Sequence, residues 1–324
     1  MSFSTPMGQL LDRQSPAIRE EEWLIAPPLD EGLLNGAKRR IWSLDHLISE
    51  VWRKHGHEVV EGLAPPEGMN DALLFWPKTM DLGRWWLDQL NACCAPSSTL
   101  RIVGEHHGGG KRVPGELKAR GMSHQRLDNA RRCSLYQATT VAEDAGDHWS
   151  RFEALDLTLV SHPGIFGHGR LDDGTGMLLE VLPTLEGQVL DAGCGDGVIS
   201  AWLARQGAEV TAVDINHLAL EATRRTLSAN DLKGEVLPSD MLAAVEGPFD
   251  AIVSNPAFHQ ERSVSIDPAR KLIEQASKKL TPKGALYLVA NSFLPYMDLM
   301  KKHFGRVEVL RETSRFRVYR ASRR

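Results

Sequence analysis

The sequence predicts an α/β protein with two mostly parallel sheets, one in each half of the chain. In the second half, short apolar runs of strand character alternate with segments whose apolar residues recur at helical spacing. Repeated strand-then-helix order is typical of a doubly wound sheet. The first half repeats several of these runs in the same order, which indicates an internal duplication. A chain of 324 residues is long enough for two such domains.

The second half contains seven runs that we expect to form strands. The last two are joined by a short polar turn and are predicted to form an antiparallel hairpin at one edge of the sheet. In order, the runs are GQVLDAG (187–193), AEVTAVD (208–214), GEVLP (234–238), FDAIVSN (249–255), GALYLVAN (284–291), RVEVL (306–310) and RFRVYRA (315–321). A helix is expected over HLALEATRRTLSAN (217–230).

Three pairs of segments are the evidence for the duplication. They are DALLFWPK at 71 with DAIVSNPA at 250, LRIVG at 100 with LYLVA at 286, and RCSLYQA at 132 with RFRVYRA at 315. Chance similarity between strands explains one such pair, but three pairs in order at nearly constant spacing favour a real repeat. We therefore expect two domains, 1–145 and 151–324, with a boundary in the polar stretch 141–154.

The composition is that of a soluble globular protein, with 42% hydrophobic and 25% charged residues. No apolar run approaches the roughly 18 residues that cross a bilayer. The N-terminus has acids and a proline where a signal peptide is apolar. We expect a cytoplasmic protein with no membrane partner. The four cysteines show neither zinc-binding nor disulfide spacing, so we expect buried thiols and no metal.

The distribution of charge says more about partners than the net charge of −4. Between 101 and 132, eight Lys and Arg residues stand against three acids, and between 301 and 324 nine stand against two. Such basic segments can contact phosphates. Solvated surface charge explains either segment alone equally well.

A glycine-rich turn follows the first strand of the second half, in VLDAGCGDGVIS. Gly193, Gly195 and Gly197 carry no Cβ, so a ligand can approach the backbone N–H groups that begin the next helix. The dinucleotide pattern would need its third glycine at position 198, which is Val198. The spacing G-x-G-x-G preceded by Asp191 instead resembles the first motif of class I S-adenosylmethionine-dependent methyltransferases.

Two further acids end the next two strands in register with this turn. Asp214 can accept hydrogen bonds from ribose hydroxyls, and Asp240 lies where an adenine amino group would be. Ile215 and Met241, which follow them, are expected beside the same nucleoside. Any one of these acids could be a helix cap. Three acids in register with the glycine turn predict S-adenosyl-L-methionine as the cofactor.

The fourth strand ends in the sequence SNPAFHQ (254–260). Two acceptors, the Asn255 side-chain oxygen and the Pro256 carbonyl, can grip the hydrogens of an aromatic amino group and aim its lone pair at a methyl donor. Phe258 offers a face for a planar base, worth about 1–3 kcal/mol. Catalysis would then depend on positioning, with Asn255, Pro256 and Phe258 as the catalytic residues and Asn255 also beside the cofactor. Asn-Pro is also a common turn, but not usually at a strand end of this kind.

The segment from about 155 to 321 resembles the small-domain class I methyltransferases that act on amino groups, whose signature is Asn-Pro-Pro-Phe/Tyr. It is most similar to the bacterial ribosomal RNA guanine-N2 methyltransferases, and among them to the small-subunit enzyme. The segments that carry this likeness are PGIFGHGRLDDGTGMLL (163–179), SNPAFHQ (254–260), NSFLPY (291–296) and RFRVYRA (315–321). The first half is similar to that enzyme only in FWPK, IVGE and ARRCSLY.

The resemblance implies two tandem Rossmann-like class I methyltransferase domains, of which the N-terminal copy is degenerate. Trp76 stands in the first half where the second has Asn255, and the first half has no glycine turn after a strand. The cluster GEHHGGGKRV (104–113) is no ATP-binding loop, because Glu105 and Arg112 stand where that motif needs a glycine and a hydroxyl. The degenerate copy is expected to dock RNA. We predict Lys111, Arg112, Arg131 and Arg132 as its RNA contacts.

Other expected substrate contacts come from the second half. By resemblance, the segment before the glycine turn covers the cofactor, with Phe166, Arg170 and Asp172 in contact, although its glycines are equally consistent with a plain loop. His259 contacts substrate or begins a helix. Ala257 replaces the second proline of the family signature, so we expect a looser but active loop.

The expected function is transfer of a methyl group to the N2 amine of one guanosine in small-subunit (16S) ribosomal RNA. The expected partner is that RNA or the small subunit, and the expected state is a monomer. A large-subunit (23S) guanine-N2 enzyme has the same layout and is the alternative. DNA adenine and release-factor glutamine methyltransferases fit less well, because no target-recognition domain or small helical N-domain is found. A non-catalytic assembly protein that binds rRNA is the alternative outside enzymes.

Overall fold

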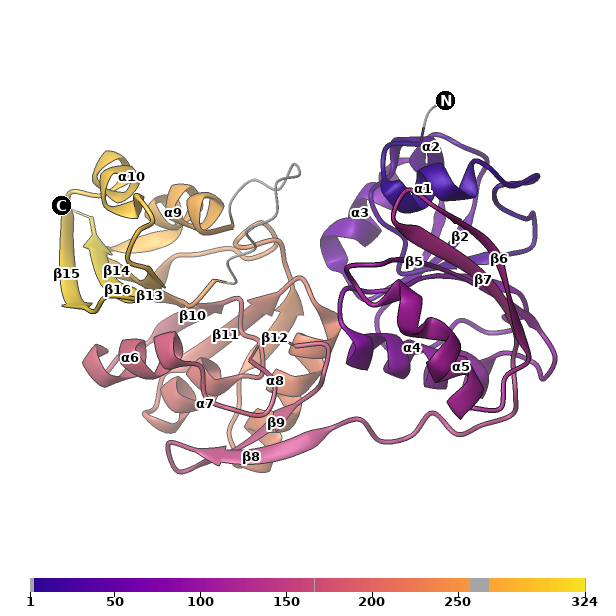
Figure 1. Ribbon diagram of the computed structural model, residues 1–324. Helices are drawn as coiled ribbons and strands as arrows, with labels where there is room; N and C mark the ends of the chain where they lie inside the picture. The colour runs from indigo at the N-terminus through magenta and orange to yellow at the C-terminus, as the bar shows by residue number, and fades with distance from the viewer. Residues whose placement is uncertain (1–2, 166, 257–267, 324) are drawn as a thin grey trace. The chain divides into compact units, whose positions relative to one another are not determined.

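The structure, a computed structural model, describes residues 3–165, 167–256 and 268–323 and divides into two compact units, Met1–His148 and Trp149–Arg324 (Figure 1). Each unit contains a seven-stranded sheet with helices packed against it.

The sheet of the first unit has the order β3-β2-β1-β4-β5-β7-β6. Only β7 runs against its neighbours. The strands are β1 Trp23–Ile25, β2 Arg40–Ser43, β3 Glu58–Glu61, β4 Ala72–Phe75, β5 Thr99–Glu105, β6 His124–Ala130 and β7 Cys133–Thr139. The helices are α1 Pro6–Leu11, α2 Glu31–Leu34, α3 His46–Lys54, α4 Met80–Cys93, the 3-10 helix η1 Gly110–Arg112 and α5 Val113–Ala119.

The sheet of the second unit has the order β12-β11-β10-β13-β14-β16-β15, again with one strand, β16, antiparallel to both neighbours. The strands are β10 Gln188–Ala192, β11 Glu209–Asp214, β12 Glu235–Pro238, β13 Phe249–Ser254, β14 Leu280–Asn291, β15 Arg306–Glu312 and β16 Phe316–Ser322. The helices are α6 Asp173–Val181, α7 Val198–Arg205, α8 His217–Ala229, α9 Pro268–Lys279 and α10 Tyr296–His303. The expected strands, the parallel order and the edge hairpin are confirmed.

The duplication is confirmed by the identical strand order of the two sheets. The edge hairpins agree in detail. Strand β7 spans 133–139 and β16 spans 316–322, and each hairpin has a register irregularity at the same place, between Arg126 and Asp128 in one and between Val309 and Arg311 in the other. Equivalent hairpin residues are therefore 183 positions apart along the chain.

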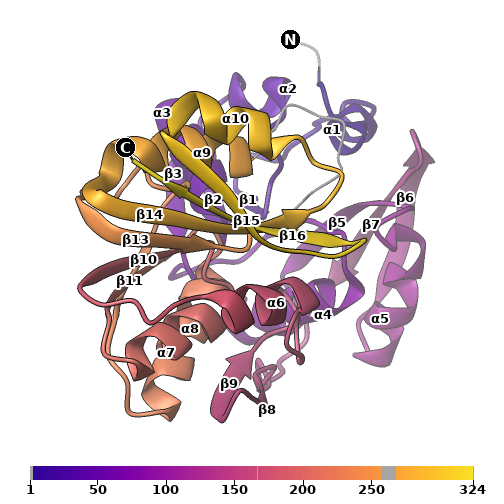
Figure 2. The same ribbon diagram turned by 90° about the vertical axis from the view of Figure 1, so that its left-hand side faces the viewer.

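Burial on both faces explains why the central strands read as unbroken apolar runs. In the second unit, α9 and α10 pack one apolar cluster against the sheet, and α6, α7 and α8 pack another against the opposite face (Figure 2). Residues of β13 enter both clusters, Ile252 the first and Val253 the second. This double layer fixes the ends of the strands, where the candidate site is located.

An additional hairpin, β8 Ser150–Ala154 with β9 Leu157–Ser161, precedes α6. The division between the two units, after His148, falls within the stretch 141–154, in which residues 141–149 have no regular structure and residues 150–154 form a strand. The hairpin turns at Leu155 and Asp156, which have φ of 54° and 55° without the glycine or asparagine that marks such turns. Its second strand is held to α8, since Thr226 Oγ1 accepts the Val160 N–H at 2.9 Å.

None of the described helices combines the length and hydropathy that a membrane span requires.

Candidate functional site

The predicted cofactor residues lie at the carboxyl ends of β10, β11, β12 and β13. From β10 the chain first builds β11 and β12 on one side and then returns to add β13 on the other. Open α/β sheets bind ligands at such a switch in strand order. The glycine turn follows β10, Asp214 ends β11, and Asn255 follows β13.

The glycine turn is built from residues with left-handed backbone. Gly193, Gly195 and Gly197 have φ of 81°, 56° and 81°, a region that side-chain-bearing residues adopt only under strain. A Cβ on Gly193 or Gly195 would meet no atom within 4 Å, so the space above these two residues is open. A Cβ on Gly197 would lie 2.9 Å from Thr223 Cα. The first two glycines therefore leave room for a ligand, and the third permits α7 to pack on α8.

Asp191 lies beneath this turn and is fully buried. Its Oδ2 accepts a hydrogen bond from Ser200 Oγ at 2.6 Å, while Oδ1 has no partner among the described residues. Burial raises the pKa of Asp191 to about 7, and burial likewise raises the pKa of the neighbouring Asp196 to about 7. A buried carboxyl with an unused oxygen is suited to a ligand that brings a positive charge or a donor.

Asp214 is held by two backbone N–H groups. Gly195 N donates to Oδ2 at 3.1 Å and Asn216 N donates to Oδ1 at 2.9 Å. Burial raises its pKa, and these hydrogen bonds oppose the rise. The Asn216 side chain in turn donates to the Gly164 carbonyl at 2.9 Å, which fixes the segment before α6 beside this strand end. Ile215 is partly exposed at the same edge.

Asp240 and Met241 follow β12. Asp240 forms an ion pair with Lys271 of α9, and Met241 is buried with a left-handed φ of 52°. A ligand amino group would therefore have to share the Asp240 carboxylate with Lys271. Their contact with the cofactor remains a prediction.

Asn255 has a defined orientation. Its Nδ2 donates to Asp172 Oδ2 at 2.8 Å and to Thr175 Oγ1 at 2.8 Å. Because a carboxylate only accepts hydrogen bonds, the amide nitrogen must face Asp172. Both amide hydrogens are therefore occupied, and Oδ1, which has no partner in the part of the chain that the structure describes, can accept from a ligand. Pro256 is buried directly after it.

The structure gives Asp172 a role within the protein. Asp172 is the N-cap of α6, where its Oδ2 accepts the Thr175 N–H at 3.0 Å, besides holding Asn255. Arg170 is exposed and has no ion pair among the described residues. Four predicted or notable positions, Phe166, Ala257, Phe258 and His259, lie outside the described residues.

The corresponding strand end of the first unit is filled by Trp76, which is only 4% exposed. A Cβ on Gly83 would come within 2.3 Å of its ring, and a Cβ on Gly104 within 2.8 Å of its own Cβ. The ring therefore occupies the place where the second unit carries Asn255. The predicted RNA contacts Lys111, Arg112, Arg131 and Arg132 are all exposed.

Sequence reasoning missed the residues that support the site from behind. Thr175, Ser200 and Asn216 each fix a predicted residue or its neighbouring segment. Only Asn216 left a signal, because it is the N-cap of α8 and asparagine is a preferred residue at that position. Thr175 and Ser200 act through a packed geometry that no local pattern encodes.

Comparisons with known proteins agree with this arrangement. The family model "Methyltransferase small domain" matches residues 156–320, and "Methyltransferase small domain N-terminal" matches residues 8–152. The Ribosomal RNA small subunit methyltransferase C of Chromohalobacter salexigens is 49% identical over 99% of this chain and 98% of its own length. That of Stutzerimonas stutzeri is 37% identical over 98% and 99%.

Among solved structures, the T. thermophilus 16S rRNA N2 guanosine methyltransferase, solved in complex with AdoMet and guanosine, is similar with a TM-score of 0.86. It is 26% identical, and the match covers 99% of this chain and 92% of that one. The chain therefore belongs to the small-domain methyltransferase family, in the group that contains the ribosomal RNA small subunit methyltransferases C.

Proposed function

We propose that the protein transfers a methyl group from S-adenosyl-L-methionine to the exocyclic N2 amine of one guanosine in 16S ribosomal RNA. The observation that carries this proposal is the orientation of Asn255 at the carboxyl end of β13. Its amide nitrogen is held at 2.8 Å by Asp172, and its Oδ1 has no hydrogen-bond partner among the described residues. The names of the relatives and the guanosine-bound structural match support the same substrate.

The residues present fit the proposed cofactor. The open space above Gly193 and Gly195 admits a ligand close to the backbone, and the unpartnered Asp191 Oδ1 suits the cationic amino group of its methionine part. Asp214 Oδ1 and Oδ2, fixed by backbone donors, are placed to accept from two ribose hydroxyls. When bound, S-adenosyl-L-methionine supplies an electrophilic methyl group.

The protein's own contribution is to position the amine. A guanine N2 amine has a delocalised lone pair, and two acceptors that grip its hydrogens favour a pyramidal nitrogen with a directed lone pair. Asn255 Oδ1 and the Pro256 carbonyl are the proposed acceptors, and Phe258 is the proposed stacking face. No strong general base is required, because the methylated nitrogen is acidic and loses its proton to water. The rate enhancement then comes chiefly from alignment.

We also propose that the first unit is an RNA-docking copy. Trp76 fills the place of its catalytic residue, whereas Lys111, Arg112, Arg131 and Arg132 stay exposed for phosphates. A guanosine within a helix must be unstacked before it reaches Asn255, at a cost of a few kcal/mol. The protein is proposed to work as a cytoplasmic monomer without a metal ion.

The experiment is transfer of tritiated methyl groups to naked 16S rRNA, small subunits and large subunits from an undermodified strain. The expected result is label in the small-subunit RNA, at the N2 of a single guanosine, and its loss by at least about a hundredfold in Asn255→Ala. Label in the large subunit alone would replace the proposal with the 23S alternative. Label in neither, with rRNA binding intact, would favour the assembly protein.

A further inference from the structure

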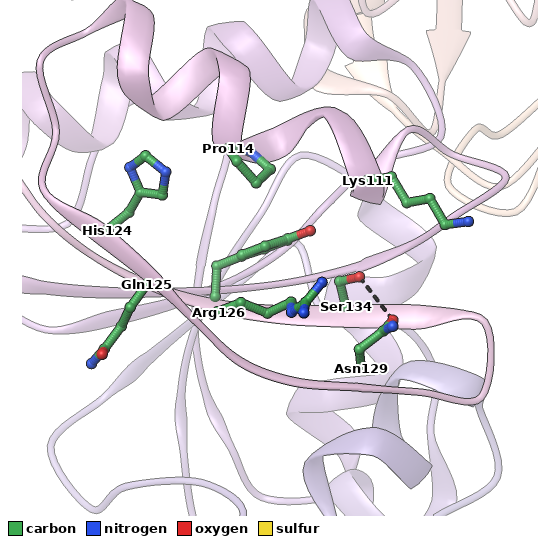
Figure 3. A pocket seen from close by; sticks show the side chains of 8 residues that line it. Lys111, Pro114, His124, Gln125, Arg126, Asn129 and Ser134 are labelled. Carbon is green, nitrogen blue, oxygen red and sulfur yellow. Dashed lines mark hydrogen bonds between the residues drawn. The ribbon is translucent and has the colours of Figure 1, made fainter.

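The first unit contains a cavity of about 530 Å³ between the start of α5 and the β6–β7 hairpin (Figure 3). Pockets for nucleotide-sized ligands fall in the range of about 300–1,000 Å³. The residues that line it are Lys111, Pro114, His124, Gln125, Arg126, Asn129, Ser134 and Tyr136. No carboxylate is among them, so the cavity favours an anionic ligand.

The two cations of this cavity have no acidic partner in the part of the chain that the structure describes. Lys111 and Arg126 are exposed and form no ion pair among the described residues. The acids nearest in sequence are already neutralised, because Asp128 pairs with Arg13 at 2.8 Å and Glu116 with Arg84 at 2.9 Å. The positive charge at the cavity is therefore available to a ligand.

In the second unit, an arginine side chain occupies the equivalent place. Arg317 occupies the position equivalent to Ser134, forms an ion pair with Glu312, and donates to Tyr319 Oη at 3.1 Å. Pairing of Glu312 with Arg317 in the hairpin register corresponds to pairing of Asn129 with Ser134 in the first unit. A large, partly exposed cation from the chain itself thus lies over the tyrosine in the second unit.

The first unit has no equivalent of that ion pair, because Asn129 and Ser134 stand where the second unit has Glu312 and Arg317. Ser134 is short and 2% exposed, and among the described residues its Oγ hydrogen-bonds to Asn129 Oδ1 at 3.2 Å and His106 Nε2 at 3.1 Å. Tyr136, the counterpart of Tyr319, keeps its place with no hydrogen bond from a described side chain to its hydroxyl. Because Ser134 is much shorter than Arg317, the first unit has open space here. Beside this space lie a phenol hydroxyl and two cations that form no ion pair among the described residues.

We propose that this cavity binds one nucleotide of single-stranded ribosomal RNA, with a phosphate between Lys111 and Arg126. Asn129, Ser134 and Tyr136 supply hydrogen-bond partners for the ribose, and the exposed His124 ring offers a stacking face for the base. An RNA strand is favoured over a small anion because further exposed cations continue the surface. Arg112 adjoins Lys111, and Arg131 and Arg132 form the turn of the same hairpin. The proposal rests on the proposed function and adds the place where the docking copy holds RNA.

The first test measures binding of the full-length Lys111→Gln/Arg126→Gln variant to 16S rRNA over a range of salt concentrations. We expect affinity to fall on the order of tenfold and the slope of log K against log salt to shrink by about 0.7, as for one lost contact to a single-stranded phosphate. The matched control is Lys38→Gln/Lys118→Gln, which removes the same charge from exposed lysines outside the cavity. Equal loss in both variants would overturn the proposal, since it would show a general charge effect.

The second test closes the cavity without changing net charge. Asn129→Glu/Ser134→Arg transplants the ion pair of Glu312 and Arg317, and it should weaken rRNA binding by about as much while S-adenosyl-L-methionine affinity and the melting temperature stay unchanged. Wild-type rRNA affinity in this folded variant would overturn the proposal. The proposal would also be overturned if inorganic phosphate or guanosine monophosphate bound in the cavity while Lys111→Gln/Arg126→Gln had no effect on RNA binding.

The two proposals fail separately. If the wild-type protein methylates no rRNA, the proposed function fails while binding still tests the cavity. If it methylates 16S rRNA and both cavity variants bind and methylate like wild type, only the cavity proposal fails.

Discussion

At the scale of single residues, the site depends on side chains that orient other side chains. Asn255 can offer Oδ1 to an amine only while its Nδ2 is held by Asp172 and Thr175. An amide that rotates freely presents a donor to the amine about as often as an acceptor, which abolishes the alignment.

We therefore expect Thr175→Val to lower kcat about 3- to 10-fold and Asp172→Asn to lower it about 10- to 100-fold, with KM for S-adenosyl-L-methionine little changed. The larger effect of Asp172→Asn follows because the new amide can donate and so permits the flipped Asn255. The rate of single-turnover methyl transfer to guanosine-containing RNA measures the loss in each variant. A uniform rise in KM with constant kcat would show that Asp172 binds substrate and does not position Asn255.

Asp191 gives a pH dependence whose sign follows from its raised pKa of about 7. In the free protein the carboxyl is neutral below that pH and cannot pair with the cationic amino group of the cofactor. Affinity for S-adenosyl-L-methionine should thus fall as pH decreases from 8 to 6. Calorimetric titration of wild type and Asp191→Asn checks this, and an equally steep pH dependence in the variant would contradict it.

The same residue makes a prediction about stability. A carboxyl whose folded-state pKa exceeds the unfolded value of about 3.9 favours the fold at low pH, and that contribution is lost as pH rises through about 7. Asp191→Asn should therefore stabilise the ligand-free protein at pH 8, by about 1–3 kcal/mol, while it weakens cofactor binding. Urea unfolding of both proteins at pH 5 and pH 8 measures this difference in the free energy of unfolding. Part of the pH dependence of stability should remain in Asp191→Asn, because Asp196 also has a raised pKa.

At the scale of elements, two glycines of the strand-to-helix turn serve different purposes, one cofactor binding and the other helix packing. Gly193 and Gly197 have the same φ of 81°, but an added Cβ meets open space at the first and Thr223 Cα at 2.9 Å at the second. Gly193→Ala should cost about 1–2 kcal/mol from backbone strain and lose cofactor affinity. Gly197→Ala should cost more, because α7 must also move away from α8. Thermal unfolding with and without cofactor ranks the two, and equal destabilisation would contradict this account.

Elements also show where prediction from sequence succeeded and where it could not. The parallel strands were predictable because burial on both faces forces unbroken apolar runs, as in β13. Hairpin β8–β9 escaped because its first strand is only half-buried and its turn at Leu155–Asp156 lacks the usual residues. The acids at strand ends were readable from spacing, whereas Thr175 and Ser200 became part of the site only through packing.

At the scale of the whole molecule, the first unit keeps a complete core around a buried ion pair. Arg101 is 2% exposed and Glu22 1% exposed, and Arg101 Nε donates to Glu22 Oε1 at 2.7 Å. Removing one partner leaves a buried charge without its counter-ion, so Arg101→Leu should destabilise the first unit by about 3–5 kcal/mol.

Tryptophan fluorescence during urea unfolding can follow this loss, because six of the eight tryptophans belong to Met1–His148. Glu22→Leu/Arg101→Leu should recover most of the loss, since no charge is then left buried. A double variant as unstable as the single one would mean that side-chain volume, and not charge, determines the cost.

Trp76 has a consequence for how many methyl donors one chain can carry. Its ring occupies the strand end that Asn255 uses in the other sheet, and it packs against Gly83 and Gly104, so no small rearrangement reopens that place. Although the two sheets have identical topology, titration with S-adenosyl-L-methionine should therefore show one bound molecule per chain. The first unit contributes surface, and it neither competes for the methyl donor nor retains the demethylated product.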